Sequence, residues 1–332
     1  MQDFNLIPCK KLVVGGDVGF AQTKLSCPEK NINITIPSAV AEPQQAMAGI
    51  GGGQKLFIID GGKYVFGHDA LVAGSKQIQS LDEVWLLKYM AGLICSAAAA
   101  AGLDLHEVGT LSTGLPIDMW RKHQNMAKEI LQTIHCNGET YTFDRVDVRP
   151  QGVGALGHHT QLGAPADECG LVVDIGGNTV LAVRYDQLRP IGTNTRQYNE
   201  LGVLSVAHAL TPYLSEMSGG RKVTAIKAMK AIRDRKYLSH DIGTQVDSAI
   251  DSYAERLLAN LRSDYRDIIP ELDRLVVAGG GAYLVGEALK KEYPRVTVLA
   301  DPEYANVRGY AYLSGLTNYQ HGVTDANVEK MK

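Results

Sequence analysis

Two segments of this sequence resemble one another, and this internal repeat constrains the fold more than any other feature. Residues 12–25 read LVVGGDVGFAQTKL, and residues 171–183 read LVVDIGGNTVLAV. Each segment begins with a short apolar run typical of a buried strand, reaches an aspartate, turns through glycine and continues as a second apolar strand. The two aspartates, Asp17 and Asp174, lie about half the chain length apart. The repeat therefore predicts two related lobes, each with a β-hairpin that carries an aspartate at its turn.

Between and after these hairpins, predicted strands alternate with predicted helices, which is typical of α/β proteins with helices flanking sheets. A further hairpin with an Asp-Gly-Gly turn is expected at residues 55–67, and with the glycine-rich residues 49–53 it predicts a small β subdomain. Ser80 and Glu83 have capping-box spacing and predict the start of a helix. The polar residues 163–168 predict the boundary between the lobes. The remaining predicted helices are 120–135, 152–161, 201–214, 223–235, 244–265, 284–293 and 306–316, and the remaining predicted strands are 108–115, 140–149, 275–278 and 296–299.

Composition excludes several classes of protein. The 332 residues include 33 Lys plus Arg and 36 Asp plus Glu, a net charge of −3, so we expect no direct binding to nucleic acid or to a membrane. The five cysteines are scattered and lack zinc spacing, which favours reduced thiols over a disulfide framework. The N-terminal residues lack the features of a signal peptide. The apolar residues 89–103 are shorter than the roughly 20 residues that a membrane span needs, and they predict a buried helix in a cytoplasmic protein.

Glycine-rich turns place backbone N–H groups where phosphate oxygens can reach them, so each such turn is a candidate phosphate site. The P-loop signature is absent, because Gly62-Lys63 is followed by Tyr64 rather than Ser or Thr. A GxGxxG pattern occurs at Gly152, Gly154 and Gly157. The strand before it carries four charges and ends in proline, whereas a dinucleotide fold begins with a buried apolar strand. We therefore expect these glycines to allow close packing of helices, with a Rossmann dehydrogenase as the alternative.

The two Asp-Gly hairpins make a stronger case together with the glycines at 279–281. A nucleotide triphosphate with Mg²⁺ needs carboxylates near the ion and backbone donors around the phosphates. One hairpin in each lobe would supply both. The alternative is that all three segments are β-turns that use glycine only for its positive φ.

In these segments the sequence resembles the superfamily of actin, the heat-shock chaperones and the sugar kinases. The phosphate-1, phosphate-2 and adenosine motifs of that superfamily match residues 17–24, 174–179 and 279–282. Within it, the chain is similar to the ParM/StbA family of plasmid-segregation actins in GGKYVFGHDAL near residue 61, TGLPIDMW near 113, ELGV at 200–203 and NVRGYAYL near 306. The resemblance implies a two-lobed actin-like α/β fold, a duplicated ribonuclease H-like fold with a nucleotide cleft between the lobes. Domain I would be residues 1–162 plus 305–332, with the small β subdomain near 40–75, and domain II would be residues 163–304.

The resemblance also assigns roles to individual residues. Asp17 would hold Mg²⁺, with Asp174 close to the water shell of the metal, and Lys24 would reach the phosphates. Asp174 and Gln151 would be the catalytic residues: Asp174 would help to activate the attacking water and Gln151 would orient it, since glutamine is no base. Backbone donors to the phosphates and neighbours of the ribose and adenine would come from Gly19, Phe20, Ala21, Gly176, Gly177, Asn178, Thr179, Gly279, Gly280, Gly281 and Ala282.

The activity that the resemblance implies is slow, assembly-coupled hydrolysis of ATP to ADP with Mg²⁺, with GTP also possible. The protein would polymerise into filaments and segregate plasmid DNA through a DNA-binding adaptor protein. Two alternatives stay open: a non-polymerising ATPase of the chaperone or reactivase type, and a small-molecule kinase.

Overall fold

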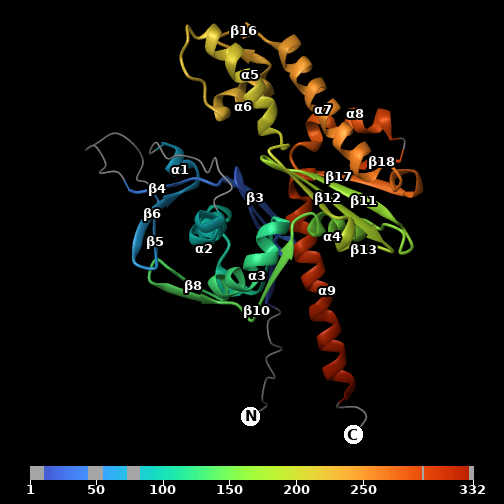
Figure 1. The fold of residues 1–332 in the computed structure, drawn as a ribbon. Helices are drawn as coiled ribbons and strands as arrows, with labels where there is room; N and C mark the ends of the chain where they lie inside the picture. Colours follow the sequence, from blue (N-terminus) through green and yellow to red (C-terminus); the bar gives the residue numbers. More distant parts are fainter. Residues whose placement is uncertain (1–10, 44–54, 73–82, 294, 329–332) are drawn as a thin grey trace. The chain divides into compact units, whose positions relative to one another are not determined.

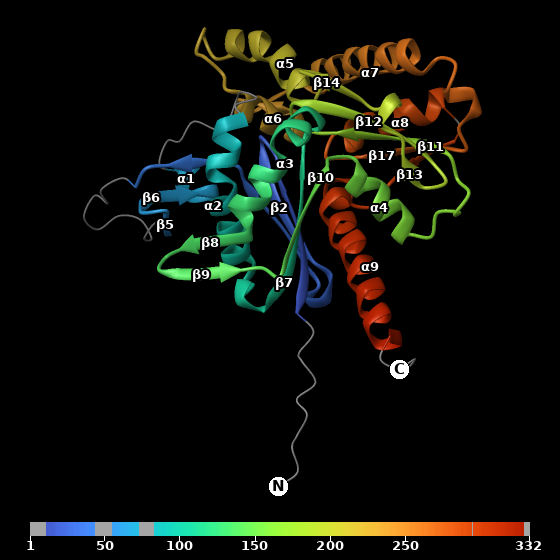
Figure 2. The same cartoon turned by 60° about the horizontal axis from the view of Figure 1, so that its bottom comes forward.

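The computed structural model describes residues 11–43, 55–72, 83–293 and 295–328. The chain divides into two compact units, which are residues 1–158 with 306–332 (unit 1) and residues 159–305 (unit 2). Both units are drawn in Figures 1 and 2. The predicted boundary at 163–168 lies a few residues inside unit 2, and the two-domain assignment by residue number stays a prediction.

The central sheet of unit 1 is built on the first repeated hairpin. Strand β1 pairs antiparallel with β2 and parallel with β7, and the sheet order is β10-β7-β1-β2-β3. β1 is buried along nearly its whole length, as its apolar run predicts. The strands are β1 (Leu12–Val18), β2 (Gln22–Cys27), β3 (Ile32–Pro37), β7 (Val108–Leu115) and β10 (Arg145–Pro150).

The central sheet of unit 2 repeats this arrangement with one additional strand. The hairpin consists of β11 and β12, which pair antiparallel. β12 also pairs with β14 and β13 at one edge, β11 pairs parallel with β17, and β17 pairs parallel with β18. The predicted duplication therefore extends beyond the hairpin to the whole central sheet, which has five strands in unit 1 and six in unit 2, and this confirms the two-domain α/β fold. These strands are β11 (Gly170–Ile175), β12 (Thr179–Asp186), β13 (Arg189–Pro190), β14 (Arg196–Asn199), β17 (Arg274–Ala278) and β18 (Val296–Val298).

Unit 1 has a second, smaller sheet with the order β4-β6-β5-β8-β9. The hairpin of β5 and β6 around Asp60 confirms the predicted turn. The glycine-rich residues 49–53 lie outside the described part. The predicted helix 120–135 is confirmed as a helix, but it ends at Gln132. The predicted strand 140–149 was wrong, because it is two strands in different sheets. The cause is tertiary, because β8 pairs through Cys136 with Ile59 of β5. The strands are β4 (Val40–Ala41), β5 (Leu56–Ile59), β6 (Gly62–Phe66), β8 (Thr133–Cys136) and β9 (Glu139–Thr142).

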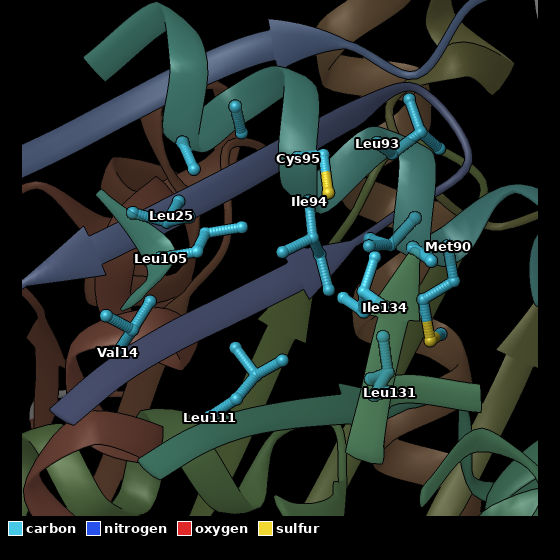
Figure 3. Close-up of a cluster of buried hydrophobic side chains, with 14 of the residues drawn as sticks. Val14, Leu25, Met90, Leu93, Ile94, Cys95, Leu105, Leu111, Leu131 and Ile134 are labelled. Carbon is cyan, nitrogen blue, oxygen red and sulfur yellow. The ribbon is translucent and has the colours of Figure 1, made fainter. Parts of the chain in front are cut away.

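Helix α2 (Glu83–Ala101) lies between the two sheets of unit 1 (Figure 1). It is long and apolar enough to cross a membrane, but 61% of its apolar window is buried inside the protein. It confirms the predicted buried helix, whereas Ser80 of the expected capping box lies outside the described residues. Figure 3 shows how its side chains meet those of the neighbouring elements: Met90, Leu93, Ile94 and Cys95 gather with Val14, Leu25, Leu105, Leu111, Leu131 and Ile134.

The other helices of unit 1 are α1 (Gly67–Val72), α3 (Ile117–Gln132), α4 (Val153–Gln161) and α9 (Ala305–Val328). Glycines let α9 approach its neighbours at backbone distance. A Cβ on Gly15 of β1 would lie 1.9 Å from the Val307 carbonyl oxygen, and a Cβ on Gly309 would lie 1.6 Å from that of Gly154. A Cβ on Gly157 would meet Leu313 at 2.7 Å. The GxGxxG glycines thus serve close packing, as expected, and the Rossmann alternative has no support in the fold.

Unit 2 has its own core, in which helices cover the hydrophobic side chains of β11, β12 and β17. The helices are α5 (Leu204–Met217), α6 (Ala225–Asp234), α7 (Gly243–Tyr265) and α8 (Ala282–Glu292), and a short hairpin joins β15 (Lys236–Tyr237) to β16 (His240–Asp241). Short 3-10 helices η1 to η5 lie at Pro28–Lys30, Leu105–Glu107, Gly192–Asn194, Ile269–Glu271 and Pro302–Tyr304.

Candidate functional site

The turn of the first hairpin follows Asp17 directly. The Gly19 N–H donates to the Gln22 carbonyl at 3.0 Å, which closes the turn and engages one of the predicted phosphate donors. The N–H groups of Phe20 and Ala21 donate to no carbonyl in the described part of the chain. The Ala21 carbonyl accepts from the Ser38 N–H at 3.1 Å, so the segment that follows β3 holds this turn in place. Two consecutive backbone donors are therefore presented three and four residues after the aspartate.

The turn of the second hairpin has the same internal bond. The Gly176 N–H donates to the Thr179 carbonyl at 2.9 Å, and among the described residues the N–H groups of Gly177 and Asn178 have no carbonyl acceptor. The predicted repeat is thus a repeat of turn geometry, with an aspartate, a bonded glycine and two presented N–H groups in each unit.

The ELGV run at 200–203 holds the second turn in place. The Gly202 N–H donates to the Asn178 carbonyl at 3.1 Å, and the Leu204 N–H donates to the Gly177 carbonyl at 2.8 Å. A Cβ on Gly202 would lie 2.4 Å from the Gly177 oxygen, so only glycine fits. Sequence reasoning identified ELGV by resemblance alone and missed this positioning role.

Asp17 and Gln151 meet within unit 1. Gln151 Nε2 donates to Asp17 Oδ1 at 2.9 Å, and both side chains are buried, at 9% and 8% exposure. Lys24 lies opposite Asp17 in the β1–β2 register. Burial raises the pKa of the Asp17 carboxyl, while the positive charge of Lys24 and the Gln151 hydrogen bond lower it. Ionisation of the Asp17 carboxyl therefore costs free energy, and a cation bound beside it would stabilise the charged form.

Gln151 is positioned by backbone and by a residue distant in sequence. Its N–H donates to the Leu115 carbonyl at 2.8 Å, and Gly152 then turns the chain with φ of 80°. The buried Asn306 Oδ1 accepts from the N–H groups of Gly152 at 3.0 Å and Ala155 at 3.1 Å. It thereby caps the start of α4, directly after Gln151. Asn306 was missed as a positioning residue, although it lies in the NVRGYAYL segment noted by resemblance.

Asp174 lies at the end of β11 and is 6% exposed. Next to it is the third glycine turn, because a Cβ on Gly279 would lie 2.5 Å from Asp174 Oδ1. The Gly281 N–H donates to the Ile175 carbonyl at 2.9 Å, which fixes this turn to the strand end. Gly279 has φ of 80°, a conformation that favours glycine.

The predicted residues therefore form two groups, one in each unit. Unit 1 brings together Asp17, Lys24, Gln151 and the turn at 19–21, and unit 2 brings together Asp174, the turn at 176–179 and the turn at 279–282. Within the described ranges, no group of three or more His, Cys, Asp or Glu residues could hold a metal ion. Mg²⁺ usually takes only one or two carboxylates together with phosphates, so a pre-formed cage is not needed.

Two family models match the two halves of the chain. Residues 15–154 match the N-terminal domain of actin-like proteins, and residues 172–291 match the C-terminal domain of the archaeal, MreB-like actin homologue. The chain is an actin-like protein. Both matches include an aspartate and the turn after it, Asp17 in the first and Asp174 in the second.

Known relatives of this actin-like protein agree over nearly the whole length. It is 27% identical over 328 residues to an archaeal actin homolog of Thermoplasma acidophilum, which covers 90% of this chain and 97% of the relative. A crystal structure of an archaeal actin homolog matches with a TM-score of 0.75 at 23% identity, covering 92% of this chain and 99% of the other. A ParM from a 15-stranded filament of Clostridium botulinum matches with a TM-score of 0.74 at 16% identity, covering 93% and 100%.

Proposed function

We propose that this actin-like protein binds and slowly hydrolyses a nucleoside triphosphate and assembles into filaments. The observation that carries the proposal is the duplicated turn, in which a buried aspartate precedes a bonded glycine and two presented N–H groups in both units. A backbone that presents consecutive N–H groups is a general phosphate-binding device. The archaeal actin homolog that shares this fold has been crystallised in complex with ADP.

In this proposal the unit 1 residues bind phosphate and metal. Phe20 and Ala21 donate backbone N–H groups to phosphate oxygens, and Lys24 adds a positive charge beside them. Asp17 fits a role toward Mg²⁺, because its carboxylate is buried beside a single lysine and a cation would offset the cost of its burial. Bound Mg²⁺ would neutralise the negative charge that develops on the phosphates.

Gln151 would orient the attacking water. A carboxylate only accepts hydrogen bonds, so the amide must turn its Nε2 toward Asp17. The Gln151 carbonyl oxygen then faces away from Asp17 as an acceptor for a water O–H. In unit 2, Gly177 and Asn178 would donate to phosphate, and the carboxylate of Asp174 would take the proton of the water or orient it.

The proposal also covers the assembly of filaments and their use in the cell. The ParM relative belongs to a filament, as its description states, and self-association of this chain is proposed by analogy with it. We further propose that the filaments act in the cytoplasm, and that they segregate plasmid DNA through a DNA-binding adaptor, as the resemblance to the ParM/StbA family implies. The test below separates filament formation from the two alternative activities.

The experiment is right-angle light scattering and phosphate release, measured on the purified protein with Mg²⁺ and either ATP, GTP, ADP or no nucleotide. The variant is Asp174→Asn, and the matched control is Asp251→Asn on the exposed surface of α7. We expect scattering to rise with triphosphate and to fall as phosphate appears. Asp174→Asn should keep the rise and lose about a hundredfold or more in phosphate release, the size of one proton-transfer contribution.

Two results would contradict the proposal. Phosphate release without scattering over a wide range of protein concentration would indicate a non-polymerising ATPase. Phosphate release only after a small-molecule acceptor is added would indicate a kinase.

A further inference from the structure

An aromatic residue and a carboxylate meet beside the third glycine turn in unit 2. Tyr283 directly follows Ala282 in the first turn of α8, and its hydroxyl donates to Glu303 Oε2 at 2.5 Å. Glu303 lies in η5, whose first residue, Pro302, accepts from the Gly279 N–H at 2.8 Å. A Cβ on Gly280 would lie 4.0 Å from Cβ of Glu303. The carboxylate is therefore held next to the turn that the superfamily resemblance places against the ribose and base of the nucleotide.

Core packing does not explain this pair. Tyr283 is 64% exposed, and the hydrogen bond joins two segments that the Gly279–Pro302 bond already connects. The hydrogen bond to Glu303 raises the pKa of the Tyr283 phenol to about 12, so at neutral pH the phenol remains a donor. It engages one oxygen of the carboxylate and fixes its direction. A carboxylate has about four lone-pair sites, so capacity for further donors remains.

The chemistry of the purine bases decides which one suits a carboxylate. The Watson–Crick edge of guanine carries two adjacent donors, N1–H and the 2-amino group, which match the two oxygens of a carboxylate. The same edge of adenine carries one donor, the 6-amino group, beside the acceptor N1, which a carboxylate would repel. A carboxylate at this edge therefore discriminates against adenine, because its oxygen would face the acceptor N1 without a hydrogen between them.

We propose that Glu303, held by Tyr283, recognises the base of the bound nucleotide and makes guanine nucleotides the preferred ligands of this protein. The inference rests on the proposed nucleotide site and deepens it by naming the base. Glu303 is a specificity-determining residue in this scheme, and Tyr283 positions it.

The test compares the affinities of GTP, ITP and ATP by competition against a fluorescent nucleotide analogue. ITP is guanine-like but lacks the 2-amino group, so it isolates one of the two proposed hydrogen bonds. The variants are Glu303→Gln and Tyr283→Phe, and the matched control is Glu287→Gln, which changes an exposed glutamate of α8 that pairs with Lys290. Thermal unfolding of each variant checks that it is folded.

We expect the wild type to bind GTP about tenfold or more tightly than ATP, with ITP between them, as charge-assisted hydrogen bonds to the base would give. Glu303→Gln should lose about tenfold in GTP affinity and little in ATP affinity, and it should no longer distinguish GTP from ITP. Tyr283→Phe should weaken the preference less, because the carboxylate remains, and Glu287→Gln should match the wild type.

The failures of the two proposals are distinguishable. Equal affinity for ATP and GTP in the wild type, or equal behaviour of Glu303→Gln and Glu287→Gln, overturns the base recognition and leaves the nucleotide site standing. Absence of binding by all three nucleotides in the wild type overturns both.

Discussion

Asn306 caps the start of α4, so its substitution should destabilise unit 1. Substitution of Asn306 by alanine removes the one oxygen that accepts from the Gly152 and Ala155 N–H groups. Both donors are buried beneath α9, so water cannot easily replace the lost acceptor. The start of α4, and with it the segment that carries Gln151, should loosen.

The expected loss of folding free energy follows from the cost of losing a helix cap and the cost of leaving a buried donor unpaired. Loss of an Asn cap costs about 0.5–2 kcal/mol, and a buried donor without a partner costs about 1–3 kcal/mol. We therefore expect Asn306→Ala to lower the free energy of unfolding by about 2 kcal/mol. For a folding unit of this size, that loss lowers the melting temperature by about 4–8 °C.

The measurement is differential scanning calorimetry of Asn306→Ala beside Asn306→Asp, together with phosphate release. Aspartate keeps the accepting oxygen and places a negative charge at a helix N-terminus, so it should retain much of the stability. Phosphate release should fall in the alanine variant by a larger factor than nucleotide affinity does. An unchanged melting temperature in Asn306→Ala, or an equal loss in both variants, would refute the role of the cap.

Two further substitutions test the buried charges. Because burial raises the pKa of Asp17 in the folded state, the folded protein holds this proton more tightly than the unfolded chain, and stability is lost as pH rises through the folded pKa. Asp17→Asn should therefore melt at a higher temperature than wild type at neutral pH without nucleotide, should lose this advantage in acid, and should not release phosphate; a pH series of thermal melts checks this. Tyr185→Phe removes a donor at 2.6 Å from the buried Glu168 and should cost about 1.5–3 kcal/mol in urea unfolding. Tyr253→Phe should cost nothing, because the buried Tyr253 hydroxyl has no partner among the described residues, and equal losses in the two variants would contradict the reasoning.

The two repeated hairpins and the hairpin at 55–67 could be predicted because their signals are local. An apolar run that ends in an aspartate and a glycine predicts both the strand and the turn from a few consecutive residues. The same locality explains the exact strand 108–115 and the buried helix α2. The predicted strand 140–149 was wrong because its two halves pair with different sheets, which no local pattern records.

The sequence named the candidate site residues, whose roles stay predictions, but it did not predict the hydrogen bonds that hold them. The resemblance gave Gln151 and Asp17 roles at the same nucleotide site, but their hydrogen bond was not predicted, and the two residues are far apart in the sequence. The Gly19 and Gly176 N–H groups, expected to bind phosphate, already close their own turns. The positioning roles of Asn306 and Gly202 depend on contacts to distant carbonyls and N–H groups, and composition or spacing gives no sign of them.

The crossing of α4 and α9 has a consequence for how this sequence can change over time. At the closest point Gly154 and Gly309 meet backbone against backbone, because a Cβ on Gly309 would lie 1.6 Å from the Gly154 carbonyl oxygen. At an ordinary core contact, a larger residue on one helix can be balanced by a smaller one on the other. Here both partners are already the smallest residue, so no compensating pair exists. Substitutions that are tolerated elsewhere in the core are therefore not tolerated at these two positions. Any homologue with the same helix crossing must keep both glycines.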